Sequence, residues 1–513
     1  MRVQRCLGVM AGLWLAMGGA WAAPSATAGE AGAGRALTIY NQNFAVVRET
    51  VPLSLSAGVN HLTFSDITYH LEPDSVVLRD PTGQRALQIL EQNYRADPIS
   101  QELLLSRYEG KTIDFQTRVG DHTEIVPGKI IRSGYVPHNT AFNYDQAYYA
   151  GQAAYAYGGG GQPLIEVNGK LQFALPGTPL FPALADDSIL KPTLDWTLRT
   201  DRAGPLNAEL AYVTGGMSWK ADYNVVSPQQ GSDLDLVGWV TMDNQSGRTF
   251  ENARIKLMAG DVNKVQPQHQ YGGGFGGGAF AARSEMAPPV TEKAFDEYHL
   301  YTLQRPATLR DRETKQVEFV RAQGVHSAIV YVYDGAYIDP GQYYNWTYET
   351  IRSQPSYGTQ SNPKVWTMRE IVNSQANGLG IPLPKGRVRF YRKDADGQLE
   401  FIGENEIDHT PKDETLRVYT GNAFDLAGER RQTNYNLASG NSMLDESFEI
   451  KVRNHKATPV EIRVVEHLYR GLNWTITEHS LPFLKTDAHT MEFHVPLAPD
   501  QEKTITYTAH YTW

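Results

Sequence analysis

The sequence predicts a mostly β protein, made of several antiparallel β-sandwich or β-barrel-like modules with few short helices and an immunoglobulin-like sandwich at its C-terminal end. Short runs of alternating apolar and polar residues recur along the chain, and clusters of Gly, Pro, Asn and Asp separate them. At 513 residues the chain is too long for one compact core, because a domain usually takes roughly 100 to 200 residues. We therefore expect several β domains.

Residues 1–22 resemble a cleavable secretory signal. Arg2 and Arg5 supply the positive charge, residues 7–20 are apolar, and Ala20-Trp21-Ala22 is a small-x-small cleavage site. A membrane anchor is the alternative, but the apolar run is shorter than the ~20 residues that a membrane-spanning helix needs. We therefore expect an exported chain that resides in the periplasm or outside the cell.

The composition of the exported chain excludes several kinds of chemistry. Cys6 lies within the expected signal and is the one cysteine of the sequence, so we expect no disulfide, thiolate metal site or cysteine nucleophile. The formal net charge is −10, and loss of Arg2 and Arg5 makes it −12. Because nucleic-acid binding needs a basic surface, we expect no nucleic-acid partner. No later stretch is long and apolar enough for a transmembrane helix.

The segment 36–133 predicts an N-terminal β domain with one helix. The helix is expected at Gln101 to Tyr108, because Ser100 can cap its N-terminus and Gly110 lies near its end. The alternating runs before and after this helix indicate strands.

The segment 134–163 is a Tyr/Gly-rich loop without hydrophobic periodicity. A flexible exposed loop is the favoured interpretation. The alternative is a binding surface for an envelope protein or glycan, because tyrosine offers apolar area and a hydroxyl at a small entropy cost. The candidate binding residues in this segment are Tyr148, Tyr149, Tyr155 and Tyr157.

The segment 164–265 is expected to be the first part of a central β domain. Asn168-Gly169 between two alternating runs is the clearest hairpin signal of the chain. The stretch 208–261 contains large residues in alternating positions and is expected to anchor the fold. Three of its aromatic residues are expected in the core rather than in a site: Trp219, Tyr223 and Trp239.

This stretch also carries a resemblance to a known family. The sequences AYVTGGMSWKADYNV and GWVTMDNQSGRTFENARIKLMAGD resemble the core of the bacterial domain-of-unknown-function 4139 family, whose distant relatives include mucoidy inhibitor A-like proteins. Further similar stretches are LTIYNQNFAVVRETVPL, GIPLPKGRVRFYRKDADG and FIGENEIDHTPKDETLRVYTGNAFDLAGERRQTNY. Since this family has no established activity, the resemblance implies no catalytic residue.

The segment 266–296 is a glycine-rich linker, and 297–440 is expected to be the second part of the central domain. Within it, the aromatic run from Tyr343 to Tyr348 fits a core strand or a stacking platform, and the core strand is favoured. Asp394 to Gly397 is expected to be the turn of a hairpin, because the residues that a calcium loop needs on either side are missing.

Asp408 and His409 are further candidate binding residues, since neighbouring carboxylate and imidazole groups can hold a polar ligand. The favoured alternative is a turn in which Asp408 and Thr410 satisfy backbone donors.

The segment 441–513 is expected to form the C-terminal β-sandwich, because several alternating runs follow at short spacing. In its last run, every second residue from Ile505 to Trp513 is apolar or aromatic, as in the closing strand of an outer-membrane barrel. Earlier strands carry charges on both faces, so a sandwich strand is favoured over the barrel.

No motif of a nucleophilic serine, a zinc protease or a phosphate-binding loop occurs in the sequence. We therefore expect a non-enzymatic binding or scaffolding protein of the cell envelope, with no catalytic residue, metal or cofactor. A hydrolase of envelope polysaccharide or peptide is the alternative, with carboxylates or histidines that converge only in the fold. An outer-membrane-associated β protein is the second alternative.

Overall fold

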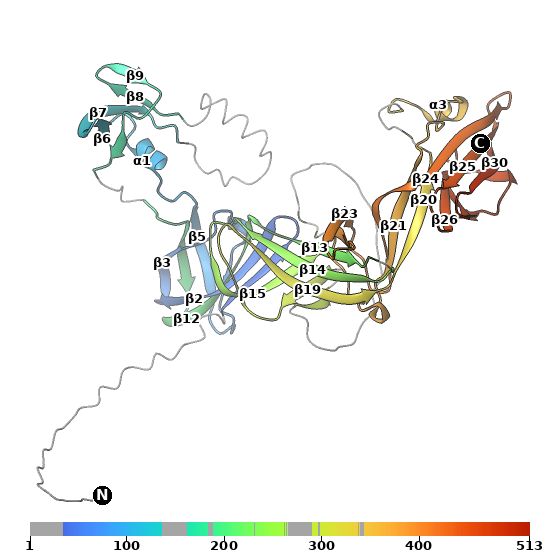
Figure 1. The fold of residues 1–513 in the computed structure, drawn as a ribbon. Coiled ribbons are helices and arrows are strands. Elements are labelled where there is room, and N and C mark those ends of the chain that lie inside the picture. Colours follow the sequence, from blue (N-terminus) through green and yellow to red (C-terminus); the bar gives the residue numbers. More distant parts are fainter. Residues whose placement is uncertain are drawn as a thin grey trace, which may run out of the picture.

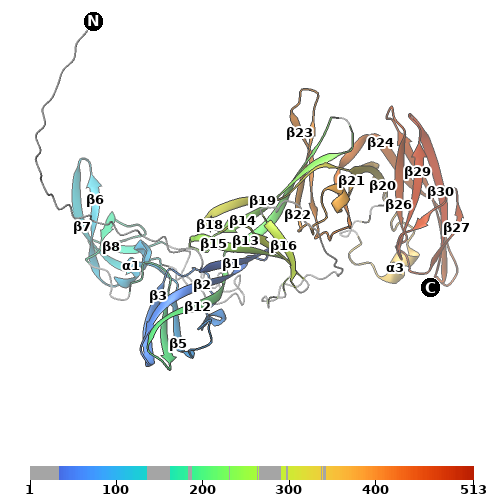
Figure 2. The same cartoon turned by 90° about the horizontal axis from the view of Figure 1, so that it is seen from below.

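The computed structural model confirms a mostly β chain built of several separate sheets (Figure 1). The sheets follow one another along an elongated molecule, and a view turned by 90° shows the same extended shape (Figure 2). The structure describes residues 34–135, 162–182, 188–229, 231–260, 262, 264, 290–295, 298–336, 338 and 343–513. Within these residues the helices are short: α1 (Gln101–Arg107), α3 (Tyr348–Ser353) and the 3₁₀ turns Pro73–Ser75 and Gln375–Asn377. In the same part of the chain, no helix has the length and apolar character needed to cross a membrane.

Two sheets form the centre of the molecule. The eight strands of the first are β1 (Arg35–Tyr40), β2 (Phe44–Leu55), β4 (Val77–Arg79), β12 (Gly204–Gly215), β15 (Phe250–Ala259), β16 (Val290–Phe295), β17 (Tyr298–Leu303) and β18 (Ala307–Leu309). The five strands of the second are β13 (Met217–Ser227), β14 (Leu234–Asn244), β19 (Glu313–Val325), β22 (Gly386–Lys393) and β23 (Leu399–Ile407). β1 pairs in parallel with β15, so the first strand joins a strand that lies far along the chain.

The stretch 208–261 contributes strands to both central sheets. β12 and β15 belong to the first sheet, whereas β13 and β14 form a hairpin in the second. Gly216 lies between β12 and β13 with a φ of 77°, which a residue with a side chain rarely adopts. The chain can therefore pass at this point from one sheet to the other.

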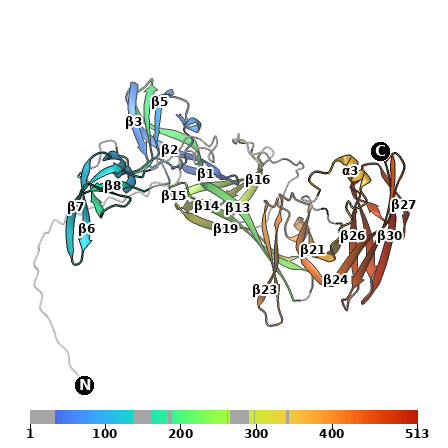
Figure 3. The ribbon, with the colours of Figure 1, turned by 90° about the horizontal axis from the view of Figure 1, so that it is seen from above.

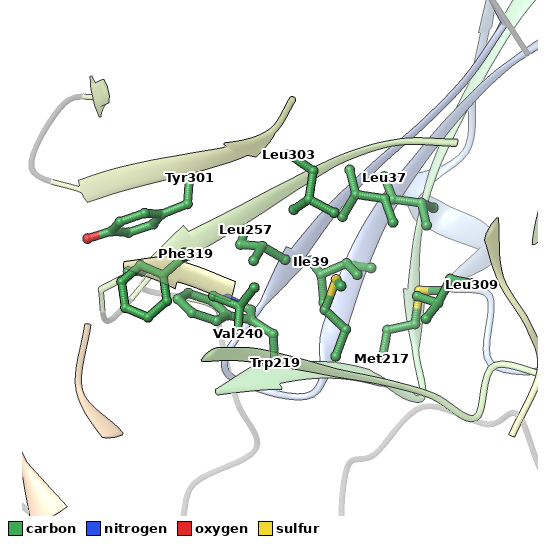
Figure 4. Close-up of a cluster of buried hydrophobic side chains, with 14 of the residues drawn as sticks. Leu37, Ile39, Met217, Trp219, Val240, Leu257, Tyr301, Leu303, Leu309 and Phe319 are labelled. Carbon is green, nitrogen blue, oxygen red and sulfur yellow. The ribbon is translucent and has the colours of Figure 1, made fainter. Parts of the chain in front are cut away.

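The largest hydrophobic core lies between these sheets and includes Trp219 and Tyr223 (Figure 4). Trp219 is 3% exposed, and its indole N–H donates a hydrogen bond to the Met258 carbonyl at 2.9 Å. Both residues therefore confirm the expected core positions. The expectation for Trp239 is wrong, because strand alternation places it on the opposite face of β14 from Val240, where it is only half-buried.

Two smaller sheets lie toward one end of the molecule (Figure 1). The three-stranded one contains β3 (Gly58–Ser65), β5 (Leu87–Arg95) and β11 (Thr193–Thr200). The five-stranded one contains β6 (Thr112–Val119), β7 (His122–Arg132), β8 (Leu164–Val167), β9 (Lys170–Gln172) and β10 (Thr178–Leu180). Two local predictions are confirmed here. The Ser100 hydroxyl caps α1 by accepting from the Leu103 amide, and Asn168 and Gly169 form the turn of the β8–β9 hairpin with positive φ.

A nine-stranded sheet forms the other end of the molecule. Its strands are β20 (Ser327–Asp334), β21 (Lys364–Val372), β24 (Thr415–Leu437), β25 (Met443–Asn454), β26 (Val460–His467), β27 (Trp474–His479), β28 (Leu484–Lys485), β29 (Thr490–Leu497) and β30 (Glu502–Thr512). The sheet curls around its own core, since the rings of Phe493 in β29 and Tyr507 in β30 are 6.0 Å apart. The long strand β24 contributes to two cores. Leu426 belongs to the core of the nine-stranded sheet, and Val418 belongs to the core between the central sheets.

Two expectations near this sheet have different outcomes. The hairpin around Asp394 to Gly397 is confirmed, because β22 and β23 pair on either side of it. The core strand at Tyr343 to Tyr348 is wrong: Tyr343 is buried, but Tyr344 is 85% exposed and no strand forms there. Thr347 accepts a hydrogen bond from the Thr350 amide and thereby starts α3, so this local capping interaction outweighs the β preference of the aromatic residues.

Candidate functional site

The binding residues expected from the sequence do not form one site. Tyr148, Tyr149, Tyr155 and Tyr157 lie outside the described residues. Asp408 and His409 follow β23, and the Asp408 side chain is 93% exposed. The His409 ring nitrogen Nδ1 accepts a hydrogen bond from the Lys385 amide at 3.1 Å, and the Thr410 hydroxyl donates to the Asp408 carbonyl. These contacts form a surface turn rather than a pocket.

A cavity of about 570 Å³ lies elsewhere, at one end of the central sheets. The end of β14, the beginning of β19 and the loop after β3 meet there. The residues that line it are Tyr69, His70, Asp243, Asn244, Gln245, Gly247, Asp311, Arg312, Glu313 and Thr314. The cavity is therefore assembled from three segments that are distant in the sequence.

Gly247 allows the Tyr69 ring to form one wall of the cavity. A Cβ atom at Gly247 would lie 1.5 Å from Cδ2 of Tyr69, so any side chain there would displace the ring. The Tyr69 amide donates to the Ser246 carbonyl at 2.8 Å, which fixes the loop after β3 against the turn after β14. The close approach of this backbone and the ring depends on glycine.

Asn244 stabilises the turn after β14 through its side chain. Its side-chain amide donates to the carbonyls of Arg248 at 2.8 Å and Arg310 at 3.0 Å, and its Oδ1 atom accepts from both the amide and the hydroxyl of Ser246. Its own carbonyl accepts from the Arg312 amide at 2.7 Å. Asn244 and Ser246 are fully buried, so these hydrogen bonds are shielded from water and fix the shape of the cavity floor.

A buried ion pair adjoins this floor, because Arg248 directly follows Gly247 in the turn. The guanidinium of Arg248 forms two parallel hydrogen bonds with the carboxylate of Glu49, at 2.6 and 2.8 Å, and one with the Tyr212 hydroxyl at 3.1 Å. Burial raises the pKa of Tyr212, so its hydroxyl stays protonated at neutral pH. The ion pair connects the turn after β14 to β2 and thus to the first central sheet.

Three carboxylates and the guanidinium of Arg312 line the cavity, and Lys315 pairs with one of the carboxylates, that of Glu313, at 3.1 Å. Asp311 accepts from the Gly247 amide at 2.8 Å, and Asp243 accepts from the Thr314 hydroxyl. The hydrogen bond from the Arg310 amide, 2.6 Å long, holds the pKa of Glu313 below its usual value. Glu313 is therefore ionised at neutral pH.

This arrangement suits a ligand with many hydroxyl groups. Carboxylate oxygens accept hydrogen bonds from hydroxyls, the guanidinium and amide groups donate them, and the tyrosine ring offers a flat apolar face. Nowhere in the described ranges do three or more His, Cys, Asp or Glu side chains converge in a way that could hold a metal ion.

Sequence reasoning missed the cavity, although one signal was present. The Asn244 to Gly247 turn lies in the stretch that resembles the known family, and a polar Asn-x-Ser-Gly sequence between two strands indicates a turn. Nothing local connects that turn to Tyr69 or to Asp311. Comparison with known proteins gives no match to a family model, a curated protein or a solved structure. The family resemblance therefore stays a prediction.

Proposed function

We propose that the chain is an exported, non-enzymatic binding protein of the cell envelope, and that its cavity binds a glycan. The observation that carries this proposal is a preformed cavity that is lined by Tyr69, by three carboxylates and by the exposed guanidinium of Arg312. Export is supported by the signal-like residues 1–22. A sugar offers an apolar ring face, which can stack on Tyr69, and several hydroxyl groups, which can bond to the carboxylates and the guanidinium.

The rigidity of the cavity supports binding of a ligand without large rearrangement. Asn244 and the ion pair of Glu49 and Arg248 are buried and hydrogen-bonded, so the floor is held in one conformation. A preorganised site does not lose conformational entropy on binding. The side chains of Gln245 and Arg312 are exposed at the rim, where Arg312 also pairs with Asp311 at 3.6 Å.

A hydrolase of envelope polysaccharide is the second candidate, because Asp243, Asp311 and Glu313 surround one cavity. Glycoside hydrolysis needs a proton donor whose pKa is raised near neutrality, together with a second carboxylate. Glu313 does not meet the first requirement, because its pKa is lowered. The proton donor would have to be Asp243 or Asp311.

Calorimetric titration of the exported chain, residues 23–513, tests the proposal. The probes are peptidoglycan fragments, O-polysaccharide, and the neutral oligosaccharides cellohexaose and maltohexaose. We expect one glycan class to bind, and Tyr69→Ala and Asp311→Asn to weaken it at least about 10-fold, which corresponds to ~1.4 kcal/mol. Asp396→Asn, in the turn between β22 and β23, is the matched carboxylate control and is expected to bind normally.

The same samples distinguish binding from hydrolysis. After incubation of the glycan with the exported chain, mass spectrometry is expected to show only the intact glycan. Shorter products that disappear in Asp243→Asn or Asp311→Asn would establish the hydrolase instead. Absence of binding to every glycan class would contradict both candidates.

A further inference from the structure

Arg312 has a backbone conformation that an arginine does not favour. Its φ is 57°, in the left-handed region that glycine, asparagine and aspartate tolerate best. Within the described residues, eight residues other than glycine have a positive φ, and seven of them are Asn or Asp. The eighth is Arg312, which lines the cavity of the central sheets. Local folding preference therefore does not explain the arginine at this position.

Backbone hydrogen bonds fix the turn that contains Arg312. The turn runs from Arg310 to Glu313, and the Glu313 amide donates to the Arg310 carbonyl at 3.3 Å. It leads into β19, which lies beside β14 (Figure 3). The Arg312 amide donates to the Asn244 carbonyl at 2.7 Å. A positive φ at the third position of such a turn usually belongs to glycine or asparagine, so the surrounding contacts hold the arginine in a strained conformation.

We infer that Arg312 serves binding rather than folding, and that its guanidinium gives the cavity specificity for a glycan that carries a carboxylate. This inference rests on the proposed glycan-binding function and narrows it to acidic sugars. A planar guanidinium can donate two parallel hydrogen bonds to one carboxylate. Glycine or asparagine would suit the turn better, but neither carries a positive charge.

The guanidinium of Arg312 is accessible to a ligand. The side chain is 89% exposed, and Arg312 is the one arginine that lines the cavity, where no lysine is present. Within the described residues its ion pair is with the neighbouring Asp311, at 3.6 Å, which is too long for a hydrogen bond. Exposed ion pairs of this kind contribute little, so Asp311 competes weakly with the carboxylate of a ligand.

The three carboxylates of the cavity are already engaged with donors of the protein. Glu313 accepts from the Arg310 amide at 2.6 Å and pairs with Lys315 at 3.1 Å. Asp311 accepts from a backbone amide, and Asp243 accepts from a threonine hydroxyl. These contacts offset part of the negative charge, so an acidic sugar can approach the guanidinium.

The same carboxylates favour a carboxylate ligand over a phosphate. A carboxylate carries one negative charge, whereas a phosphate monoester carries about −1.5 to −2 at pH 7. Repulsion from the carboxylates that line the cavity grows with the charge of the ligand. A sugar carboxylic acid therefore fits the cavity better than a sugar phosphate.

Calorimetry of the exported chain with matched sugars tests the inference. The first pair is the disaccharide of N-acetylglucosamine and N-acetylmuramic acid, with its carboxylate either free or converted to the amide. The second pair is tetragalacturonate and its methyl ester, and a phosphorylated chitobiose represents the sugar phosphates. We expect at least one free acid to bind, and its neutral counterpart to bind at least about 10-fold more weakly.

Arg312→Asn removes the guanidinium and suits the backbone. Because asparagine tolerates a positive φ, we expect this variant to melt at the same temperature as the unsubstituted chain or higher. It is expected to bind the free acid at least about 10-fold more weakly and the neutral counterpart unchanged. Arg202→Asn is the matched control and is expected to bind normally, because Arg202 is also exposed and pairs with the aspartate before it, but does not line the cavity.

The inference fails if a neutral sugar binds as tightly as its free acid, if the phosphate binds more tightly than both acids, or if Arg312→Asn keeps the affinity of the unsubstituted chain. It also fails if cellohexaose or maltohexaose binds and both free acids do not. In that case the cavity still binds a glycan, so the proposed function stands. Absence of binding to every sugar would contradict the proposed function itself.

Discussion

Arg248 and Glu49 form a two-point ion pair in the interior of the protein, although they lie 199 positions apart in the sequence. The pair connects β2, near the start of the described chain, to the turn that forms the cavity floor. Their side chains are 4% and 5% exposed, so water screens the interaction little. The same ion pair therefore stabilises the central sheets and fixes the turn that shapes the candidate site.

Removal of one partner of this pair should destabilise the chain strongly. We expect Glu49→Leu or Arg248→Met to cost about 3 kcal/mol, because each removes the hydrogen-bonded partner of a buried charge. Within the described residues only a longer ionic contact then remains, from Arg248 to Asp66 at 3.7 Å or from Glu49 to Arg35 at 3.8 Å. The double variant is expected to be more stable than either single variant. Urea denaturation measures all three, and a single variant within 1 kcal/mol of the unsubstituted chain would contradict the ion-pair account.

Trp219→Ala should lower stability before it affects ligand binding. The residue is buried between the central sheets and donates to the Met258 carbonyl, so we expect a loss of about 3–5 kcal/mol in the free energy of unfolding. Trp239→Ala is the matched control and should cost clearly less, because Trp239 is only half-buried. Equal losses in the two variants would show that the core assignment is mistaken.

Gly247→Ala should alter the cavity through Tyr69. The added methyl group would collide with the ring, and the φ of 80° adds backbone strain of roughly 1 kcal/mol. Gly169→Ala isolates that strain, because Gly169 has a φ of 74° and no atom within 4 Å of the new group. We expect glycan affinity to fall only in Gly247→Ala, as measured by calorimetry at a temperature where both variants are folded. Unchanged affinity of Gly247→Ala for the glycan would show that the Tyr69 ring does not take part in binding.

The ion pair between His467 and Asp334, 2.9 Å long, should make stability depend on pH. Burial and the charge of Arg430 act to lower the pKa of His467. The hydrogen bond to Asp334 and the charges of Asp334 and Glu466 act to raise it. The raising effects are larger, so the pKa of His467 lies above its usual value. A raised pKa means that the folded state binds the proton more tightly. The stabilisation is therefore complete below the unfolded pKa of about 6.5.

This stabilisation is lost as the pH rises through the folded pKa. Denaturation between pH 5 and pH 9 should show that His467→Gln is most destabilising at the acidic end and that its effect shrinks as the pH rises. The raised pKa of His467 would be disproved by a stability difference that does not change over this range.

Local signals in the sequence predicted local structure correctly. Ser100 as a helix cap and Asn168-Gly169 as a hairpin turn each depend on a few neighbouring residues, and the structure confirms both. Alternation correctly identified Trp219 as a core residue, but the same expectation was wrong for Trp239. The aromatic run beginning at Tyr343 led to a wrong prediction of a core strand. Local composition does not show which tertiary contacts a segment will make.

The cavity and the contacts of Arg470 with the loop between β20 and β21 could not be predicted, because both depend on contacts between distant segments. Tyr69 follows β3 and Gly247 follows β14, and these strands belong to different sheets, so the contact exists only in the assembled fold. Arg470 likewise reaches the carbonyls of a loop that precedes it by more than a hundred residues. No periodicity or motif in the sequence connects such positions.

The dissociation constant of a glycan for the exported chain, compared with that of Tyr69→Ala, tests the central claim most directly. The cavity account predicts saturable binding of one glycan class at one site per chain, and a loss of at least about 10-fold in the variant at unchanged melting temperature. Equal binding by the two proteins, or no binding of any glycan class, would contradict it.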